Sequence, residues 1–242
     1  MGLGWKGDLQ AVILAGGLGT RLRPYTFFAP KPMLPLGDKP LMEHMVIQLS
    51  KTGITDILVT VSYLRKTIED YFGNGQELGV HIRYVRTAKP MGTAGQLKTV
   101  ERLVKESFVV LYGDSLVEAD IGKMIEFHKK KKALATLMLM PFREPMKYGF
   151  IETDAEDRVT NWKEKPVVEG WINVGCYVME PAFMKYIPAE VMYGMNDAFN
   201  AAVKKGEPVF GYKAEGDFID IGDKKSYISA NAKFVERLGR IL

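Results

Sequence analysis

The stretch that decides the fold is residues 10–22, Gln10-Ala11-Val12-Ile13-Leu14-Ala15-Gly16-Gly17-Leu18-Gly19-Thr20-Arg21-Leu22, where a short apolar run meets a glycine-rich turn. Residues 10–15 have the length and continuous apolar character of a strand buried on both faces of a parallel sheet. The three glycines allow the backbone to approach a polyanion and aim N–H groups at phosphate oxygens, and Arg21 adds a bidentate donor. The spacing matches neither the dinucleotide fingerprint G-x-G-x-x-G nor a Walker loop. A plain strand-to-helix turn is the alternative.

Composition narrows the class of protein. The chain has 242 residues and 33 Lys+Arg against 29 Asp+Glu, a net charge of +4, which is too small to indicate nucleic acid as a partner. The single Cys176 excludes an intramolecular disulfide and favours a reducing, cytoplasmic setting. The longest strongly apolar run, residues 133–142, is half the length of about 20 residues that a membrane helix needs. Residues 1–8 lack the apolar stretch of a signal peptide, so we expect no membrane partner.

Apolar runs of strand length alternate with amphipathic stretches of helical length from residue 10 onward. This β-α-β-α order predicts an α/β fold with a Rossmann-like, doubly wound, mixed but mainly parallel sheet, whose ligands lie beyond the carboxyl ends of the strands. After Leu134, four strand-like runs predict a more antiparallel region with a hairpin turn at Glu156-Asp157. The expected strands are 10–15, 57–61, 80–86, 108–112, 133–140, 149–153, 158–163, 171–179, 209–213 and 218–221, and the expected helices are 40–52, 64–72, 93–104, 121–131, 194–205 and 223–238.

A second feature is a lysine held between prolines, Ala29-Pro30-Lys31-Pro32-Met33-Leu34-Pro35, which restricts the backbone and fixes where the ammonium emerges. Residues 16–26 followed by Lys31-Pro32 resemble the signature of the sugar-1-phosphate nucleotidyltransferases, the nucleotide-sugar pyrophosphorylases. The resemblance extends over nearly all of residues 10–235. It continues at Met91-Gly92-Thr93-Ala94-Gly95, Tyr112-Gly113-Asp114, Lys147-Tyr148-Gly149, Glu164-Lys165-Pro166, Ile172-Asn173-Val174-Gly175 and Asp220-Ile221-Gly222.

The resemblance implies an enzyme that joins a nucleoside triphosphate (NTP) to a sugar-1-phosphate and releases pyrophosphate. The sugar phosphate oxygen attacks the α-phosphorus in line, which needs positioning and charge neutralisation more than a strong base. Lys31 matches the lysine that stabilises charge at the α-phosphate and the leaving pyrophosphate. The residues that match nucleotide-binding positions are Leu14, Ala15, Gly16, Gly17, Gly19, Thr20, Arg21, Thr87, Gly92, Thr93 and Asp114.

The same resemblance implies a metal site and a sugar-phosphate site. Asp114 and Asp220 match two carboxylates that hold Mg²⁺, a hard cation suited to such ligands. Lys165, with Glu164 before it, matches the pair that meets the sugar phosphate and the sugar. The expected sugar-phosphate-binding residues are Tyr148, Gly149, Glu164, Lys165 and Asn173, and the expected catalytic residues are Arg21, Lys31, Asp114, Lys165 and Asp220.

The expected organisation is a tail at residues 1–9 and one catalytic domain at 10–242. Residues 10–132 form its nucleotide-binding half, 133–222 its sugar-binding half and 223–242 a C-terminal helix. Guanylyl- and adenylyl-type members of the family often append a left-handed β-helix of hexapeptide repeats, and this chain contains no such repeats. Oligomer contacts usually supplied by that appendage are therefore in question, and a homo-oligomer is an open alternative.

The motifs divide between two kinds of relative. Residues 90–95, 144–149 and 172–175 look most like mannose-1-phosphate guanylyltransferases. Residues 112–114, 120–121 with 127–129, and 170–173 look like glucose-1-phosphate cytidylyltransferases. Thr87 stands where thymidylyl and uridylyl branches often carry glutamine. We therefore expect GTP and mannose-1-phosphate, with glucose-1-phosphate cytidylyl, thymidylyl or uridylyl transfer as alternatives.

Three further classes compete with this interpretation. A non-catalytic, nucleotide-sugar-binding regulatory subunit would tend to lose the charged set, whereas Arg21, Lys31, Asp114, Lys165 and Asp220 are all present. A choline-phosphate-type cytidylyltransferase would ignore sugar phosphates. A nicotinamide-dependent dehydrogenase would bind NAD without Mg²⁺.

Overall fold

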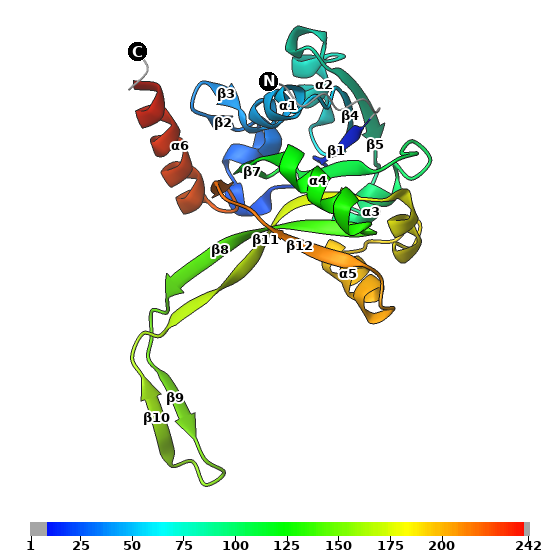
Figure 1. Ribbon diagram of the computed structural model, residues 1–242. Helices are drawn as coiled ribbons and strands as arrows, with labels where there is room; N and C mark the ends of the chain where they lie inside the picture. The colour runs from blue at the N-terminus through cyan, green and yellow to red at the C-terminus, as the bar shows by residue number, and fades with distance from the viewer. Residues whose placement is uncertain (1–8, 240–242) are drawn as a thin grey trace.

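A seven-stranded mixed sheet forms the centre of the computed structural model, which describes residues 9–239 (Figure 1). The strand order is β12-β8-β11-β6-β1-β4-β5, and β11 runs antiparallel to both of its neighbours, whereas the other pairs are parallel. The α/β fold and its mixed, mainly parallel sheet are thus confirmed. The strands are β1 (Gln10–Leu14), β4 (Asp56–Val61), β5 (His81–Arg86), β6 (Phe108–Tyr112), β8 (Ala135–Pro145), β11 (Val167–Met179) and β12 (Val209–Lys213).

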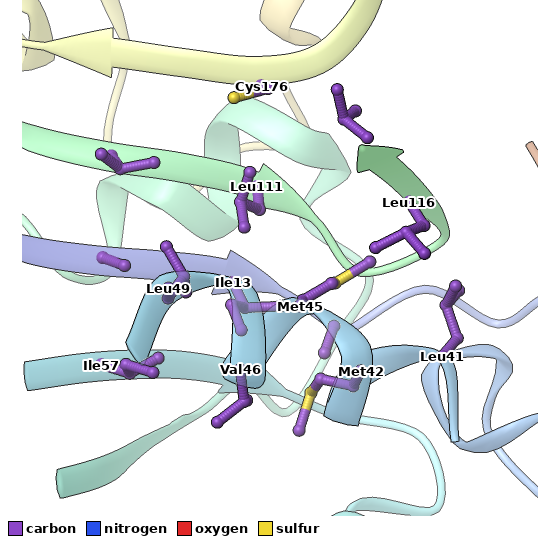
Figure 2. Close-up of a cluster of buried hydrophobic side chains, with 14 of the residues drawn as sticks. Ile13, Leu41, Met42, Met45, Val46, Leu49, Ile57, Leu111, Leu116 and Cys176 are labelled. Atoms are coloured by element: carbon purple, nitrogen blue, oxygen red, sulfur yellow. The ribbon is translucent and has the colours of Figure 1, made fainter. Parts of the chain in front are cut away.

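Both faces of this sheet are covered, as the continuous apolar character of residues 10–15 predicts. Along β1, Ala11 and Ile13 point into one core cluster and Val12 and Leu14 into the other, because successive side chains alternate across a strand. Helix α1 (Leu41–Lys51) packs on the first face, where its apolar residues meet Ile13, and the buried Cys176 lies beyond Leu111 in the same core cluster (Figure 2). Cys176 therefore belongs to the core, as expected.

The helices divide between the two faces. The first core cluster includes residues of α1, α2 (Arg65–Phe72), α4 (Ile121–Lys131) and α6 (Lys224–Gly239). The second includes residues of α3 (Gly92–Lys98), α5 (Met195–Lys204) and the 3-10 segment Pro181–Tyr186. Within residues 9–239, no helix is both long and apolar enough to cross a membrane. Further 3-10 segments are Thr20–Leu22, Tyr25–Phe27, Lys31–Met33 and Gln76–Leu78.

The position of β1 fixes where a ligand can lie. The chain passes from β1 to β4 and β5 on one side and then places β6 on the other side of β1. The strand order therefore reverses between β1 and β6, and their carboxyl ends open into a crevice. The glycine-rich turn follows β1, and Asp114 follows β6.

Three two-stranded sheets complete the fold, and one of them forms a long projection. Strands β8 and β11 leave the body and continue into β9 (Phe150–Thr153) and β10 (Val159–Lys163), so the hairpin extends far from the sheet (Figure 1). We call residues 141–171 the arm, bounded where Pro141 pairs with Trp171. The other pairs are β2 (Pro35–Leu36) with β3 (Lys39–Pro40), and β7 (Ser115–Glu118) with β13 (Asp217–Asp220).

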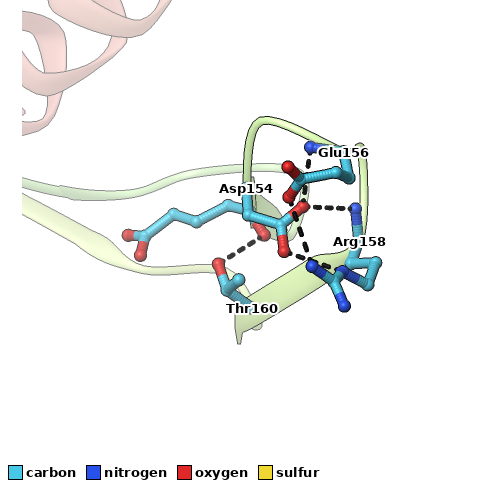
Figure 3. A network of polar contacts seen from close by, with 5 residues as sticks. Asp154, Glu156, Arg158 and Thr160 are labelled. Atoms are coloured by element: carbon cyan, nitrogen blue, oxygen red, sulfur yellow. Dashed lines mark hydrogen bonds and ion pairs between the residues drawn. The ribbon is translucent and has the colours of Figure 1, made fainter.

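The tip of the arm is a tight turn held by its own side chains (Figure 3). The Asp154 carboxylate accepts hydrogen bonds from the backbone N–H groups of Glu156 and Arg158, at 3.0 and 2.9 Å, and from the Arg158 guanidinium at 3.0 Å. Asp157 adopts a left-handed conformation at φ 63°, which aspartate tolerates better than most residues. The hairpin turn expected at Glu156-Asp157 is therefore present.

Several expected boundaries are wrong. The helix expected at 93–104 ends at Lys98, because Thr99 turns the chain: its N–H and its hydroxyl both donate to the Gln96 carbonyl, and i→i+3 bonds follow. Strand β7 was not expected, and the strand expected at 218–221 pairs with it rather than joining the main sheet. Residues 1–8 of the expected tail and 240–242 of the expected C-terminal helix lie outside the described residues.

Candidate active site

A cavity of about 470 Å³ opens at the crevice between β1 and β6. The turn after β1, the loop after β6 and the start of α3 form its wall, so the three segments expected to meet a nucleotide do converge. Most of the sequence-predicted nucleotide-binding residues line it, together with Lys31. Those residues are Leu14, Ala15, Gly16, Gly17, Gly19, Thr20, Arg21, Gly92, Thr93 and Asp114.

The glycine-rich turn has a defined shape. Gly19 lies at φ 61°, a left-handed conformation that favours glycine, and its carbonyl accepts a hydrogen bond of 2.8 Å from the Thr26 hydroxyl. Gly16 has a different requirement, since a Cβ there would come within 2.6 Å of the Gln96 side-chain oxygen. Gly17 has nothing within 4 Å of such an atom, so its backbone is open on that side.

Gln96 is a cavity residue that the sequence analysis missed. Its side-chain oxygen accepts hydrogen bonds from the Gly16 N–H at 2.9 Å and from the Thr60 hydroxyl at 3.0 Å. The amide thereby links α3 to the glycine-rich turn and to β4. The available signal in the sequence was a polar residue one turn into a helix whose first turn contains Gly92 and Gly95. This signal did not reveal the contacts of Gln96, because its partners are 80 and 36 residues away.

Lys31 and Asp114 form an ion pair at the cavity wall. The distance from Nζ of Lys31 to Oδ2 of Asp114 is 3.0 Å. Lys31 is only 7% exposed, because the 3-10 segment Lys31–Met33 folds its stem inward. The Asp114 side chain remains 45% exposed, and the bond from the Gly113 N–H to the Leu14 carbonyl, 2.9 Å, ties its loop to β1. A buried cation and an accessible carboxylate thus share one wall.

Strand pairing brings Asp220 close to Asp114, although Asp220 is not among the residues that line the cavity. It is the last residue of β13, where it pairs with Ser115, the neighbour of Asp114. Burial raises the pKa of Asp220; the Lys31 and Arg21 charges oppose this shift and the Asp114 charge adds to it. The two carboxylates therefore lie in one electrostatic environment.

This pair fits a divalent cation. Two adjacent carboxylates that repel one another are hard oxygen ligands, and Mg²⁺ takes one or two of these and completes its shell with phosphate oxygens and water. Among residues 9–239, no group of three or more His, Cys, Asp or Glu side chains could hold a metal ion by itself.

The start of α3 is locked to a segment near α5. Gly92 lies at φ 68°, and a Cβ there would come within 2.5 Å of the Tyr193 carbonyl oxygen. That carbonyl accepts the N–H groups of Ala94 and Gly95 at 3.0 and 3.2 Å. The Thr93 hydroxyl accepts the Met195 N–H at 2.9 Å. These hydrogen bonds hold residues 91–93 of the cavity wall in place. The close contact with the Tyr193 backbone leaves room only for glycine at position 92.

Two other predicted site residues do not line the cavity. Thr87 follows β5, where its N–H donates to the Val61 carbonyl at 2.9 Å, and it is not among the lining residues. The Asn173 amide donates to the Tyr177 hydroxyl at 2.8 Å and accepts the Gly175 N–H at 3.1 Å. Tyr177 packs edge-on against Tyr112, with the ring centroids 5.6 Å apart, and Tyr112 lines the cavity. Asn173 thus supports the wall instead of forming it.

The remaining predicted sugar-phosphate residues lie on the arm. Tyr148 and Gly149 precede β9, and Glu164 and Lys165 follow β10. The Glu164 carboxylate accepts a hydrogen bond of 3.2 Å from the Trp162 indole. None of these four residues lines the cavity. The structure thus brings the predicted nucleotide-binding residues together, apart from Thr87, and does not bring these four predicted sugar-phosphate residues to the cavity.

The chain also matches a known protein family. The sequence model of the Nucleotidyl transferase family matches residues 10–237, so the chain belongs to that family. The match includes the glycine-rich turn, Lys31, Asp114 and Asp220, and also the arm.

The curated relatives that match this chain are named for the transfer of different nucleotides. A UTP–glucose-1-phosphate uridylyltransferase of Synechocystis is 36% identical over 92% of this chain and 62% of its own length. A mannose-1-phosphate guanylyltransferase of Mycobacterium tuberculosis is 35% identical over 94% of this chain and 65% of its own length. The chain thus spans less than two thirds of these curated relatives.

Solved structures share the fold. A Bacillus anthracis protein assigned as a glucose-1-phosphate thymidylyltransferase superposes with a TM-score of 0.79 at 28% identity, covering 94% of this chain and 96% of its own. HddC from Yersinia pseudotuberculosis superposes with a TM-score of 0.74 at 26% identity, covering 93% of this chain and 99% of its own.

Proposed function

We propose that the protein transfers a nucleotidyl group from an NTP to a sugar-1-phosphate, giving a nucleotide sugar and pyrophosphate. The observation that carries this proposal is the ion pair of Lys31 and Asp114 at a cavity walled by a glycine-rich turn, with Asp220 held beside Asp114 by the pairing of β13 with β7. The buried Lys31 ammonium can neutralise phosphate charge directly, and the two carboxylates can do so through a bound divalent cation. No nucleophilic side chain is needed, because the substrate supplies the attacking oxygen.

The chemistry follows from this arrangement. An oxygen of the sugar phosphate attacks the α-phosphorus, a new P–O bond forms, and the bond to the bridging oxygen of the β-phosphate breaks, so its electron pair leaves with pyrophosphate. Backbone N–H groups of residues 17–19 in the glycine-rich turn and the Arg21 side chain hold the triphosphate. The Lys31 ammonium stabilises the charge that grows at the α-phosphate and the leaving group, in a cavity where such an interaction is strong.

The cofactor that fits is Mg²⁺. Asp114 and Asp220 would hold it, and the ion would neutralise phosphate charge when bound. Removal of a cation leaves two carboxylates and one ammonium at the wall, so we expect NTP binding to weaken markedly on chelation.

The nucleotide we propose is GTP and the sugar phosphate is mannose-1-phosphate. The motifs at residues 90–95 and 172–175 support this choice, and a guanylyltransferase stands among the relatives at 35% identity. Uridylyl transfer to glucose-1-phosphate is the second candidate, favoured by the relative at 36% identity. We further propose that residues 10–132 serve the nucleotide and 133–222 serve the sugar.

The test is a substrate matrix. GTP, UTP, CTP and dTTP are each combined with mannose-1-phosphate and glucose-1-phosphate in the presence of Mg²⁺, and pyrophosphate release is followed. GTP with mannose-1-phosphate should give the highest kcat/KM. A higher value for another pair would replace the specific assignment, and no turnover with any pair by folded protein would overturn the enzyme assignment.

A further inference from the structure

The carboxamide of Gln96 is buried, and yet it belongs to the wall of the cavity. Gln96 is 7% exposed and lies on α3, one turn after Gly92. A glutamine amide has an oxygen that accepts hydrogen bonds and a nitrogen with two N–H donors. Buried polar atoms are almost always paired, so each end of this amide needs a partner.

The oxygen end has its partners within the chain. Oε1 of Gln96 accepts hydrogen bonds from the Gly16 N–H at 2.9 Å and from the Thr60 hydroxyl at 3.0 Å. A backbone N–H can only donate, so the atom that faces Gly16 is the amide oxygen and not the nitrogen. The two partners are themselves joined, since the Ala15 N–H donates to the Thr60 carbonyl at 3.0 Å. Rotation of the amide would break both of its hydrogen bonds, and its orientation is therefore fixed.

The nitrogen end lacks such partners. Within residues 9–239, Nε2 of Gln96 forms no hydrogen bond. No side-chain nitrogen or oxygen in the described part of the chain is both fully buried and unpaired, so Nε2 is accessible. The open space that Gln96 lines is the cavity. The amide therefore presents N–H donors to a ligand in the cavity.

These donors lie on the uncharged side of the cavity. Among the described residues, the charged side chains that line it are Arg21, Lys31 and Asp114, and none of them comes from α3 or from the segment before it. The lining on the side of α3 is uncharged and consists of Pro90, Met91, Gly92, Thr93 and Gln96. A triphosphate is drawn to the charged side, which leaves the side of α3 for the flat and weakly polar base.

The bases differ in what they offer to such a donor. Guanine carries an oxo oxygen at position 6 and uracil carries one at position 4, and both oxygens accept hydrogen bonds. Adenine and cytosine carry an amino group at these positions, and an amino group donates. An amino group opposite Nε2 would leave donors facing one another without an acceptor, and this mismatch weakens binding in a desolvated site.

We propose that Nε2 of Gln96 donates a hydrogen bond to the oxo oxygen of the nucleobase and so selects oxo bases over amino bases. This assignment rests on the proposed function and deepens it, because it gives the choice of NTP to one side chain. In GTP, the proposed substrate, the oxygen is O6. The other end of the same amide holds Gly16, so one side chain joins recognition of the base to the turn that meets the phosphates.

Gln96→Glu tests this assignment because it inverts one end of the amide and keeps the other. One carboxylate oxygen still accepts from Gly16 and Thr60, whereas the second places an acceptor where Nε2 donated. The probes are two matched pairs of nucleotides, GTP with 2,6-diaminopurine riboside triphosphate and UTP with CTP. Each is measured with Mg²⁺ for its Kd by calorimetry and for its kcat/KM by pyrophosphate release. The added charge repels every triphosphate alike and cancels in the ratio within a pair.

The expected result is a change of preference within the substrate pair, the pair that contains the NTP with the highest kcat/KM. Wild type should prefer the oxo member, and Gln96→Glu should lower this preference by about tenfold or more. Gln96→Met can neither donate nor accept, so it should lower the preference without adding charge, and it serves as the test if the buried carboxylate prevents folding. Gln76→Glu adds the same charge at an exposed position outside the cavity lining and should retain the wild-type ratio.

The ratio separates recognition from support of the turn. Loss of the hydrogen bond to Gly16 weakens both members of a pair alike, so a purely structural role would leave the ratio unchanged. An unchanged ratio in a folded and active Gln96 variant would overturn the assignment and leave nucleotidyl transfer in place. A wild type that prefers the amino member of the substrate pair would overturn it as well. A wild type that binds none of the four nucleotides would overturn the proposed function, and the role of Gln96 with it.

Discussion

Replacement of Lys31 by methionine isolates the charge at the centre of the site. Lys31 is 7% exposed and its Nζ is 3.0 Å from Oδ2 of Asp114. Methionine keeps an unbranched apolar stem in the buried position and removes the ammonium. The Asp114 side chain is 45% exposed, so water solvates its carboxylate once the cation is gone. The substitution should therefore disturb the reaction more than the fold.

The two effects differ in size. Loss of an ion pair to a half-exposed carboxylate costs about 1 kcal/mol of unfolding free energy or less, which lowers Tm by about 2–4 °C in a chain of this length. In the transition state the ammonium faces developing charge inside a cavity, and loss of such a donor lowers kcat by about 10²–10³-fold, or about 3–4 kcal/mol. The effect on the barrier thus exceeds the effect on stability by about threefold.

The assay is pyrophosphate release at saturating NTP and sugar-1-phosphate, with thermal unfolding measured on the same samples. Lys66→Met, on the exposed face of α2, is the matched control and should retain wild-type kcat and Tm. A loss of kcat smaller than tenfold in Lys31→Met would refute the assigned role. A Tm lowered to the assay temperature would assign the loss to unfolding.

Three further changes test other parts of the structure. Asp220→Asn should raise the Mg²⁺ concentration needed for half-maximal activity, whereas Asp217→Asn on the same strand should leave that concentration unchanged, as metal titrations would show. Burial lowers the pKa of His128 below 6.5, so protonation favours the unfolded chain. The unfolding free energy should therefore fall as the pH drops below about 6.5. The difference between the urea midpoints at pH 7.5 and pH 5.5 should be smaller in His128→Gln than in the wild type. Gly92→Ala should lower the unfolding free energy by about 1 kcal/mol or more, since the site needs positive φ and has no room for a Cβ, whereas Gly170→Ala meets nothing within 4 Å and should be neutral in the same melts.

Local signals in the sequence were sufficient for many elements. The helix expected at 121–131 has those bounds in the structure, because Asp120 caps it by accepting the Lys123 N–H at 3.0 Å. Residues 108–112 form the expected strand for a similar reason, since their continuous apolar run is buried on both faces. Each of these signals lies within a few residues of the element that it specifies.

Non-local features could not be read in this way. Strand β7 exists because Ser115 pairs with Asp220, more than a hundred residues away, and a four-residue run carries no periodicity that reveals such a partner. The role of Gln96 depends on two acceptor contacts with distant backbone and side-chain groups. The arm was predicted as strands, but alternation along a strand does not say whether the strand lies on the body or beyond it.

The separation of the two halves of the site has a physical consequence for the enzyme as a whole. The nucleotide side is built at the point where strand order reverses, and the ladder of β1 with β4 and β6 fixes its backbone groups. Four of the residues predicted to bind the sugar phosphate lie instead on the arm, outside the lining of this cavity. If the arm binds the sugar phosphate as proposed, NTP affinity should depend on the cavity, whereas the KM for the sugar phosphate should depend on the arm. A mutation on the arm can therefore alter the selection of the sugar while the cavity that binds the NTP stays unchanged.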